Sequence, residues 1–181
     1  MRVLVGVRPR RPGLDEAAIR EFLASECPRL IAAVALVCGN ATVAEDAVEE
    51  ALARARERSE RGEEIRSLSG WVLTVALNLV RSGFRRAILE RRYRERESFT
   101  RSPDVAATDE ILDLQRALSA LPRRQREAVV LHYYLDLPVA EVGRVLGMSE
   151  GTVKTTLFRA RHALARTLGD PDTEEATDAV T

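Results

Sequence analysis

The residues of this sequence that are best suited to chemistry lie in the stretch GMSEGTVKTTLFRARHAL, residues 147–164. Side chains such as Lys154 and Arg159 can donate hydrogen bonds to guanine edges or phosphates, and the ring of Phe158 can contact a thymine methyl group. The 181-residue chain has a formal net charge of zero, so it is not basic enough to bind polyanions nonspecifically. The stretch is therefore a candidate for specific contact with duplex DNA.

Two helices separated by a tight turn would position these side chains. The sequence predicts a short helix over residues 139–146, ended by Gly147 in the left-handed conformation, and a long helix capped by Ser149. Two helices joined by a short turn that contains glycine form a helix-turn-helix. At about 100° per residue, the long helix directs one apolar stripe to the core. The stripe comprises Val153, Leu157, Ala160, Leu164 and Leu168.

The outward face of the long helix is predicted to make the contacts. It presents Lys154, Thr155, Phe158 and Arg159, with Thr152, His162 and Arg166 nearby. Phe158 falls outside the apolar stripe and stands among polar residues. The alternative is an ordinary solvated helix in which Phe158 packs against a neighbouring segment.

A first group of helices is predicted in the amino-terminal half. Residues 14–38 have the apolar pattern of a helix that Pro28 kinks or divides and Gly39 ends. A second helix would be capped by Thr42, which has a glutamate three residues later, as in a capping box. A third helix would begin near Trp71.

The two groups of helices are separated by a segment without periodicity, residues 98–108, whose Ser, Thr, Pro and Asp residues are typical of linkers. Beyond it, Pro122 suits the first turn of another helix. We therefore predict an all-α fold of two small helical domains joined by a flexible linker. The predicted segments are an N-terminal extension (1–13), a first domain (14–97), the linker (98–108), a second domain (109–168) and an acidic tail (169–181), which is expected to be disordered.

Charge is distributed in blocks although it sums to zero. Residues 41–64 hold eight acidic residues and four arginines, and residues 81–101 hold eight arginines and three glutamates. Residues 169–181 hold five acidic residues and no base. The zero net charge therefore conceals separate acidic and basic surfaces.

Several other classes of protein are disfavoured. No run reaches the roughly 18 apolar residues of a membrane span, and the first residues do not resemble a secretory signal, so a cytoplasmic location without membrane insertion is expected. Cys27 and Cys38 are expected to be reduced core residues, because on one helix they would lie roughly 16 Å apart. No phosphate-binding glycine loop, metal-binding cluster or activated nucleophile is visible. An enzyme, a metal and a cofactor are therefore not expected.

Two blocks of the sequence resemble one known family. LPRRQREAVVLHY and GMSEGTVKTTLFRAR are similar to region 4 of the extracytoplasmic-function (ECF) sigma factors of bacterial RNA polymerase, which are small members of the sigma-70 family. CPRLIAAVALVCGNATVAEDAVEEALARARE, followed by GWVLTVALNLVRSGFRR, is similar to region 2. The blocks stand in the family's order with a linker between them. The resemblance implies a factor that binds core RNA polymerase and directs promoter-specific initiation.

The resemblance implies that the second domain reads the upstream (minus-thirty-five) promoter element as duplex. It assigns contact with base edges to Thr152, Lys154, Thr155, Phe158 and Arg159. It assigns phosphate contact to Arg123, Arg124, Arg161 and Arg166. Phosphate contacts would orient the protein and make binding salt-dependent without specifying sequence.

The resemblance also implies that the first domain melts and captures the downstream (minus-ten) element as a single strand. The candidate residues are the loop 62–70, Trp71, Asn78, Arg81, Arg85 and Arg86. An amide such as Asn78 can pair with a base edge, and arginines can follow the backbone. The residues themselves leave other interpretations open: Asn78 could be a buried polar residue between two helices, and Trp71 a core residue.

A third implication is docking on the clamp helices of the largest subunit of the polymerase, through Asp46, Glu49 and Glu50. An acidic face would attract a basic partner, because charge pairing steers encounter and fixes register. The alternative is an ordinary solvated acidic face. The resemblance implies core RNA polymerase and promoter DNA as partners and leaves open whether an anti-sigma factor is a third.

Several positions depart from the usual family pattern, and the third helix has fewer aromatic residues and cations before Asn78 than is common. Glu49, Leu52 and Arg56 stand where a glutamine and two aromatic residues are common. Gly143 stands where alanine is usual, which permits close crossing of two helices at a cost of up to about 1 kcal/mol of helix propensity.

The main alternative function is a helix-turn-helix regulator that does not bind core polymerase, such as the output domain of a response regulator. It would need a receiver-like alternation of strands and helices, and the first half of the chain shows none. A zinc-binding anti-sigma factor would need His and Cys at close spacing, which is absent.

Overall fold

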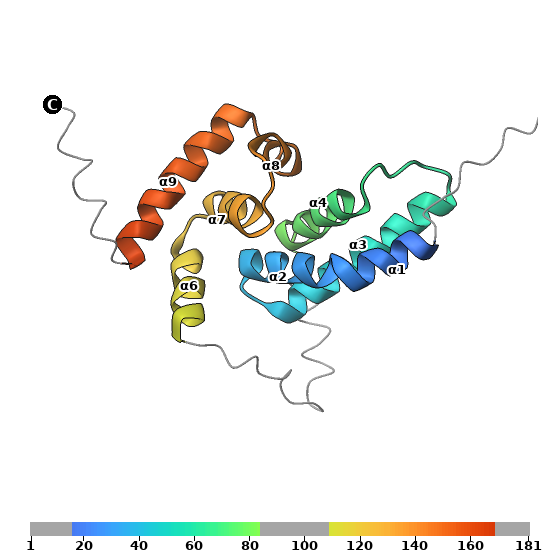
Figure 1. Ribbon diagram of the computed structural model, residues 1–181, viewed down its shortest axis with the longest axis horizontal. Coiled ribbons are helices and arrows are strands. Elements are labelled where there is room, and N and C mark those ends of the chain that lie inside the picture. The colour runs from blue at the N-terminus through green and yellow to red at the C-terminus, as the bar shows by residue number, and fades with distance from the viewer. Residues whose placement is uncertain (1–15, 84–108, 169–181) are drawn as a thin grey trace, which may run out of the picture.

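The computed structural model of the chain describes residues 16–83 and 109–168 (Figure 1). The amino-terminal body consists of α1 (Glu16–Ser25), α2 (Cys27–Cys38), α3 (Ala41–Glu60) and α4 (Leu68–Arg81). The carboxy-terminal body consists of α6 (Asp109–Ala120), α7 (Arg123–Val129), the π-helix η1 (Val130–Tyr134), α8 (Val139–Leu146) and α9 (Glu150–Leu168). Every regular element in these two ranges is a helix, which confirms the all-α prediction. The predicted extension, linker and tail, together with Arg85 and Arg86, lie outside the described residues.

Local signals set the ends of α2 and α3. Pro28 lies in the first turn of α2 and divides the predicted first helix into α1 and α2. Gly39 ends α2 with a φ of 72°, as predicted. The cap of α3 is Asn40 and not Thr42: the Asn40 side chain accepts a hydrogen bond from the N–H of Val43 at 2.9 Å. An asparagine in this position satisfies a free helical N–H as well as threonine does, so the helix begins earlier than predicted.

Helix α4 also begins earlier than predicted, at Leu68 instead of near Trp71. The Ser67 hydroxyl oxygen accepts a hydrogen bond from the N–H of Gly70 at 3.1 Å and caps the helix. The predicted loop before this helix is correspondingly shorter.

The helix-turn-helix has the predicted local geometry. Helix α8 spans the predicted residues and ends at Gly147, whose φ is 66°. The Ser149 hydroxyl oxygen accepts a hydrogen bond from the N–H of Thr152 at 3.2 Å and caps α9. Gly143 allows the close approach of the turn, since a Cβ atom there would lie 2.7 Å from the carbonyl oxygen of Met148.

The apolar stripe of α9 is buried over most of its predicted length. Val153, Leu157 and Ala160 are buried in the contacts of α9 with α7 and α8. Leu164 is half-buried. Leu168 is exposed, contrary to the prediction, because the helix runs on beyond the part of the core that covers it.

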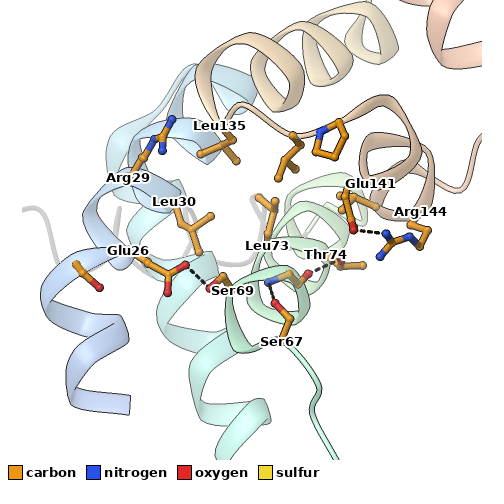
Figure 2. Close-up of a pocket in the computed structure, with 15 residues that line it drawn as sticks. Glu26, Arg29, Leu30, Ser67, Ser69, Leu73, Thr74, Leu135, Glu141 and Arg144 are labelled. Carbon is orange, nitrogen blue, oxygen red and sulfur yellow. Dashed lines mark hydrogen bonds and ion pairs between the residues drawn. The ribbon is translucent and has the colours of Figure 1, made fainter. Parts of the chain in front are cut away.

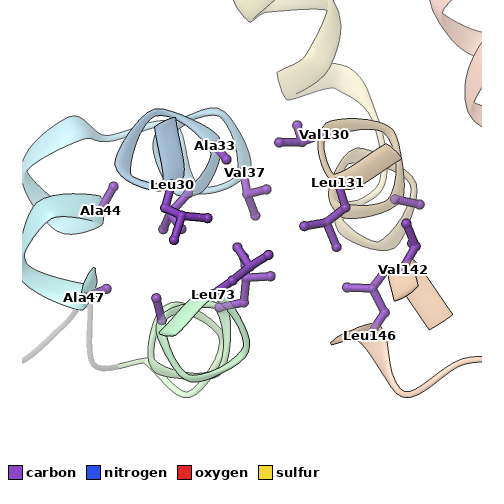
Figure 3. Close-up of a cluster of buried hydrophobic side chains, with 14 of the residues drawn as sticks. Leu30, Ala33, Val37, Ala44, Ala47, Leu73, Val130, Leu131, Val142 and Leu146 are labelled. Carbon is purple, nitrogen blue, oxygen red and sulfur yellow. The ribbon is translucent and has the colours of Figure 1, made fainter. Parts of the chain in front are cut away.

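The two bodies pack against each other, a contact that the sequence did not predict. Helix α2 contacts α6, α7 and η1, and α4 contacts α8. Figure 3 shows Leu30 and Leu73 of the amino-terminal body facing Leu131, Val142 and Leu146 of the carboxy-terminal body. Buried side chains from both bodies belong to one apolar cluster. The bodies therefore share a hydrophobic core in this structure.

A cavity of about 700 Å³ remains along one edge of this boundary (Figure 2). Its walls include Leu30, Leu73 and Leu135, from both bodies. Its rim is polar: the carboxylate of Glu26 accepts a hydrogen bond from the hydroxyl of Ser69. The packing between the bodies is thus close in the middle of the boundary and open at this edge.

The two cysteines are free thiols, as predicted: Cys27 is buried and Cys38 is half-buried. Burial of the side chain, and secondarily the nearby carboxylate of Glu49, raise the pKa of the Cys27 thiol. This cysteine therefore stays protonated and unreactive at neutral pH. Among the described residues, no group of acidic, His and Cys side chains is arranged to hold a metal ion. None of the helices in residues 16–83 and 109–168 is long and apolar enough to cross a membrane.

Candidate nucleic-acid interface

Helix α9 presents the predicted base-contacting residues to solvent. Thr152, Lys154, Thr155, Phe158 and Arg159 are all exposed. The Thr155 hydroxyl donates a hydrogen bond to the Gly151 carbonyl oxygen at 3.0 Å, so its methyl group and oxygen have fixed directions. The face combines donors with an apolar ring, which suits the mixed polar and methyl pattern of a major groove.

Phe158 is the most unusual residue of this face, because its side chain is apolar and 54% exposed. Its aromatic neighbour is His162, one turn further along the same helix. The two ring centroids lie 4.4 Å apart in an edge-to-face arrangement. Such a pairing orients the Phe158 ring while leaving it open to a partner.

The predicted phosphate-contacting residues differ in their surroundings. Arg161 and Arg166 are exposed on α9. Arg123 and Arg124 lie at the start of α7, each with a half-exposed side chain. Arg124 also has a structural contact, since its Nη1 donates to the carbonyl oxygen of Leu146 at 3.1 Å. Leu146 is the last residue of α8, so Arg124 ties α7 to the turn of the helix-turn-helix.

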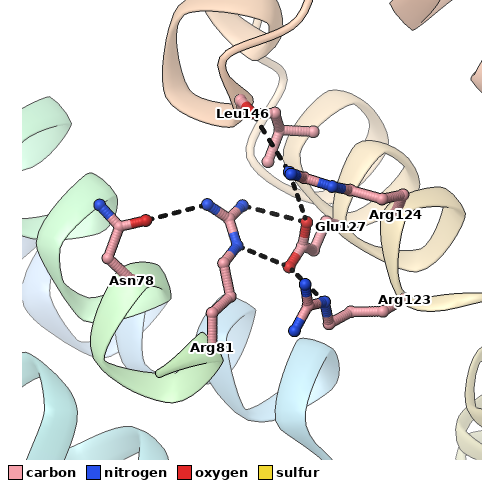
Figure 4. A network of polar contacts seen from close by, with 6 residues as sticks. All are labelled: Asn78, Arg81, Arg123, Arg124, Glu127 and Leu146. Atoms are coloured by element: carbon pink, nitrogen blue, oxygen red, sulfur yellow. Dashed lines mark hydrogen bonds and ion pairs between the residues drawn. The ribbon is translucent and has the colours of Figure 1, made fainter. Parts of the chain in front are cut away.

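Glu127, on α7, is a fully buried carboxylate that joins the two bodies (Figure 4). Arg81 of α4 donates two hydrogen bonds to it, from Nε at 2.9 Å and from Nη2 at 3.0 Å. Arg123 and Arg124 lie within ion-pair distance, at 3.6 and 3.5 Å. Sequence reasoning missed Glu127. Its signal in the sequence was a single acidic residue directly before the apolar run AVVL, four residues after Arg123 and three after Arg124.

The predicted minus-ten residues on α4 are held by contacts within the protein. Asn78 is exposed, not buried between helices, and its Oδ1 accepts a hydrogen bond from Nη1 of Arg81 at 3.0 Å. Arg81 is only 15% exposed. Trp71 is half-buried and packs against the core. In this arrangement Arg81 can contact DNA only after its bond with Glu127 opens.

The predicted docking residues lie on one side of α3. Glu49 is exposed, and Asp46 and Glu50 are half-buried. Glu50 accepts a hydrogen bond from Nε of Arg54 at 2.8 Å. Exposed pairs of this kind are worth about 0.3 to 0.5 kcal/mol, so a basic partner could displace Arg54 at little cost.

The fold and this surface together define a class: a helical DNA-binding protein that carries a helix-turn-helix. The family follows from comparison with known proteins. Residues 111–164 match the family model described as "Sigma-70, region 4". The ECF RNA polymerase sigma factor SigL of Mycobacterium tuberculosis is 34% identical over 161 residues, which are 84% of this chain and 90% of SigL. The chain belongs to the ECF RNA polymerase sigma factors, which are transcription initiation factors.

Other relatives support this assignment. EcfG of Rhodopseudomonas palustris, also an ECF RNA polymerase sigma factor, is 30% identical over 83% of this chain and 85% of EcfG. BldN of Streptomyces coelicolor is 33% identical over 73% of this chain, but the chain spans only 53% of the length of BldN.

Two solved structures have the same fold. The sigma factor RpoE from Bartonella quintana, in complex with the anti-sigma factor NepR, has a TM-score of 0.67 at 24% identity over 87% of this chain and 99% of that one. CnrH, in complex with the cytosolic domain of CnrY, has a TM-score of 0.65 at 23% identity over 86% of this chain and 90% of that one. The all-helical fold predicted from the sequence is therefore supported by these structures as well.

Proposed function

We propose that this chain binds core RNA polymerase and directs it to specific promoters, with residues 14–97 acting as region 2 and residues 109–168 as region 4. The observation that carries the proposal is the exposed face of α9, where Lys154, Phe158 and Arg159 stand on a helix fixed by a tight turn. Membership of the ECF family supports it independently. The proposal places the protein in the cytoplasm, with the polymerase and the chromosome.

In this proposal the carboxy-terminal body reads the minus-thirty-five element. Lys154, Thr155, Phe158 and Arg159 would contact base edges, with Thr152 beside them. Arg161 and Arg166, with Arg123 and Arg124 of α7, would neutralise phosphates. Specific and electrostatic contributions would thus come from one helical body.

The amino-terminal body would capture the minus-ten element and dock on the polymerase. Asn78 would pair with a base edge, and Arg81, Arg85 and Arg86 would follow the backbone of the single strand. Trp71 is the candidate stacking platform. The acidic side of α3 would meet the clamp helices of the largest subunit through Asp46, Glu49 and Glu50.

The function is tested by transcription in vitro with core enzyme and a library of promoters. We expect initiation at a restricted set of sequences that depends on this chain. If the chain binds duplex DNA but starts no transcription at any ratio to core enzyme, the alternative of a regulator that does not engage polymerase is correct.

Docking is tested separately by replacing both Glu49 and Glu50 with arginine. The double variant should bind core enzyme at least about tenfold more weakly, because reversed charges repel a basic surface. Glu57→Arg, an exposed position on the same helix, is the matched control. Equal affinities for the double variant and the wild type would remove these residues from the docking surface.

An anti-sigma factor remains a proposed partner. RpoE was solved with the anti-sigma factor NepR, and CnrH with the cytosolic domain of CnrY, but their likeness to this chain supports the fold alone. Co-purification of the full chain from its native cell would show whether such a protein accompanies it.

A further inference from the structure

The buried carboxylate of Glu127 sits at the centre of the only arginine cluster that spans the two bodies within residues 16–83 and 109–168. A carboxylate without water must be paired and hydrogen-bonded, because desolvation of an isolated charge is very costly. Arg81 meets this need from the other body with a two-point hydrogen bond. The bond thus links the burial of Glu127 directly to the contact between the bodies.

The arginines around Glu127 are the same residues that the proposed function assigns to DNA phosphates. A guanidinium group binds a carboxylate and a phosphate through the same planar fork of N–H donors. Both donors of the Arg81 fork that face the carboxy-terminal body are taken by Glu127. A third donor, on Nη1, is taken by Asn78, the candidate base-contacting residue.

We propose that the Arg81–Glu127 pair is a latch that holds the two bodies closed, with Glu127 standing in for a phosphate. While it is closed, Arg81 is withheld from nucleic acid and the side-chain oxygen of Asn78 stays bound to it; when it opens, the Arg81 guanidinium becomes available. The inference rests on the proposed function, since it regulates the same site. It assigns Glu127 a role as a positioning residue that acts through the arginines.

Another polar contact across the boundary, among the residues that the structure describes, is more exposed to solvent. Nη2 of Arg29 donates to Asp136 at 2.5 Å and to the carbonyl oxygen of Tyr134 at 2.6 Å. The side chains of Arg29 and Asp136 are 52% and 77% exposed, so water and salt screen this pair. The buried pair is screened much less, so it is the stronger of these two polar contributions to closure, beside the apolar contacts that the bodies share.

The first test measures the shape of the full chain by small-angle X-ray scattering at physiological salt. Arg81→Met removes the donors but keeps much of the apolar stem, and Glu127 retains Arg123 and Arg124. The latch predicts a larger radius of gyration for Arg81→Met than for wild type. Arg56→Met, which breaks an exposed ion pair with Glu60 on the same body, should leave it unchanged. An unchanged radius for Arg81→Met would overturn the latch.

The second test measures binding of a fluorescent oligothymidine strand over a series of salt concentrations. Glu127→Gln should bind the strand about tenfold more tightly than wild type. The slope of log affinity against log salt concentration should become steeper by about 0.7 for each additional phosphate that the protein neutralises. Asp113→Asn is the matched control, because it also removes one acid that pairs with an arginine. If the affinity of Glu127→Gln for the strand increases no more than that of Asp113→Asn, the proposal is overturned.

The two tests separate the latch from the function on which it rests. If neither wild type nor any variant binds DNA but Arg81→Met is still expanded, the DNA-binding role is rejected. The proposal that this pair holds the bodies together would still stand. Normal DNA binding without expansion would reject the latch alone. If circular dichroism shows that Glu127→Gln does not fold, the scattering result for Arg81→Met decides.

Discussion

The two bodies differ in how exposed the cationic residues of their candidate nucleic-acid sites are. On α9, Lys154 and Arg159 are exposed to solvent. On α4, Arg81 is largely buried and bound to Glu127 of the other body. Both helices are amphipathic, and in both the cations point away from the core of their own body. Helical periodicity identifies that outward direction, but a second body can cover it.

This difference has an energetic consequence for binding. An exposed arginine exchanges water for a phosphate or a base edge, which requires no rearrangement of the protein. Arg81 must first give up its two hydrogen bonds to a buried carboxylate, which has a cost that an exposed arginine does not have. In our proposal, contact with DNA by Arg81 is therefore coupled to separation of the bodies, whereas contact by α9 is not.

The largest expected effect tests whether the bodies share a core. Leu131→Ala should lower the free energy of unfolding by about 2 to 5 kcal/mol, because a fully buried leucine at the boundary leaves a cavity. Chemical denaturation measures the loss. Hydrogen exchange should also become faster in α2, although the change is in the other body.

Leu114→Ala is the control for this prediction, since Leu114 is an exposed leucine of α6. Its effect on stability should stay within about 0.5 kcal/mol. If Leu131→Ala accelerates exchange only in the carboxy-terminal body, the two bodies are energetically independent and Arg81 is not held by the packing between them.

A smaller effect is expected at the exposed surface. Arg159→Ala should weaken binding of a cognate promoter duplex by about 1 to 3 kcal/mol and relax selectivity at one base pair. Stability should be unchanged within about 0.5 kcal/mol, because the side chain is exposed. Fluorescence anisotropy with a set of single-base variants of the duplex measures both changes. An equal loss for every sequence would reassign Arg159 to a phosphate contact.

The smallest effect concerns the turn that aims α9. Gly143→Ala should destabilise the carboxy-terminal body by about 1 kcal/mol, because the strain of overpacking against Met148 exceeds the gain in helix propensity. Gly151→Ala is the matched control: it is also helical, but no atom lies within 4 Å of its new Cβ. In thermal denaturation, the melting temperature should fall for Gly143→Ala and rise for Gly151→Ala. A stabilising Gly143→Ala would mean that the turn can widen freely.

The elements of the helix-turn-helix could be predicted from the sequence because their determinants are local. Gly147 ends α8 through its own backbone freedom, and Ser149 caps α9 through a neighbour three residues away. The predicted cap of α3 was wrong, because two nearby side chains can accept the same kind of hydrogen bond. The cap is Asn40 and not Thr42. The bases contacted by α9 and the docking surface on α3 remain predictions.

The sequence alone determined the helices, their outward faces and the family, because each depends on the order of residues along one segment. Only the tertiary structure decided which outward faces meet water. Glu127 and Arg81 stand far apart in the sequence, and no periodicity relates them. Their pairing depends on how the two folded bodies pack, because a buried carboxylate needs a cation beside it and Arg81 comes from the other body.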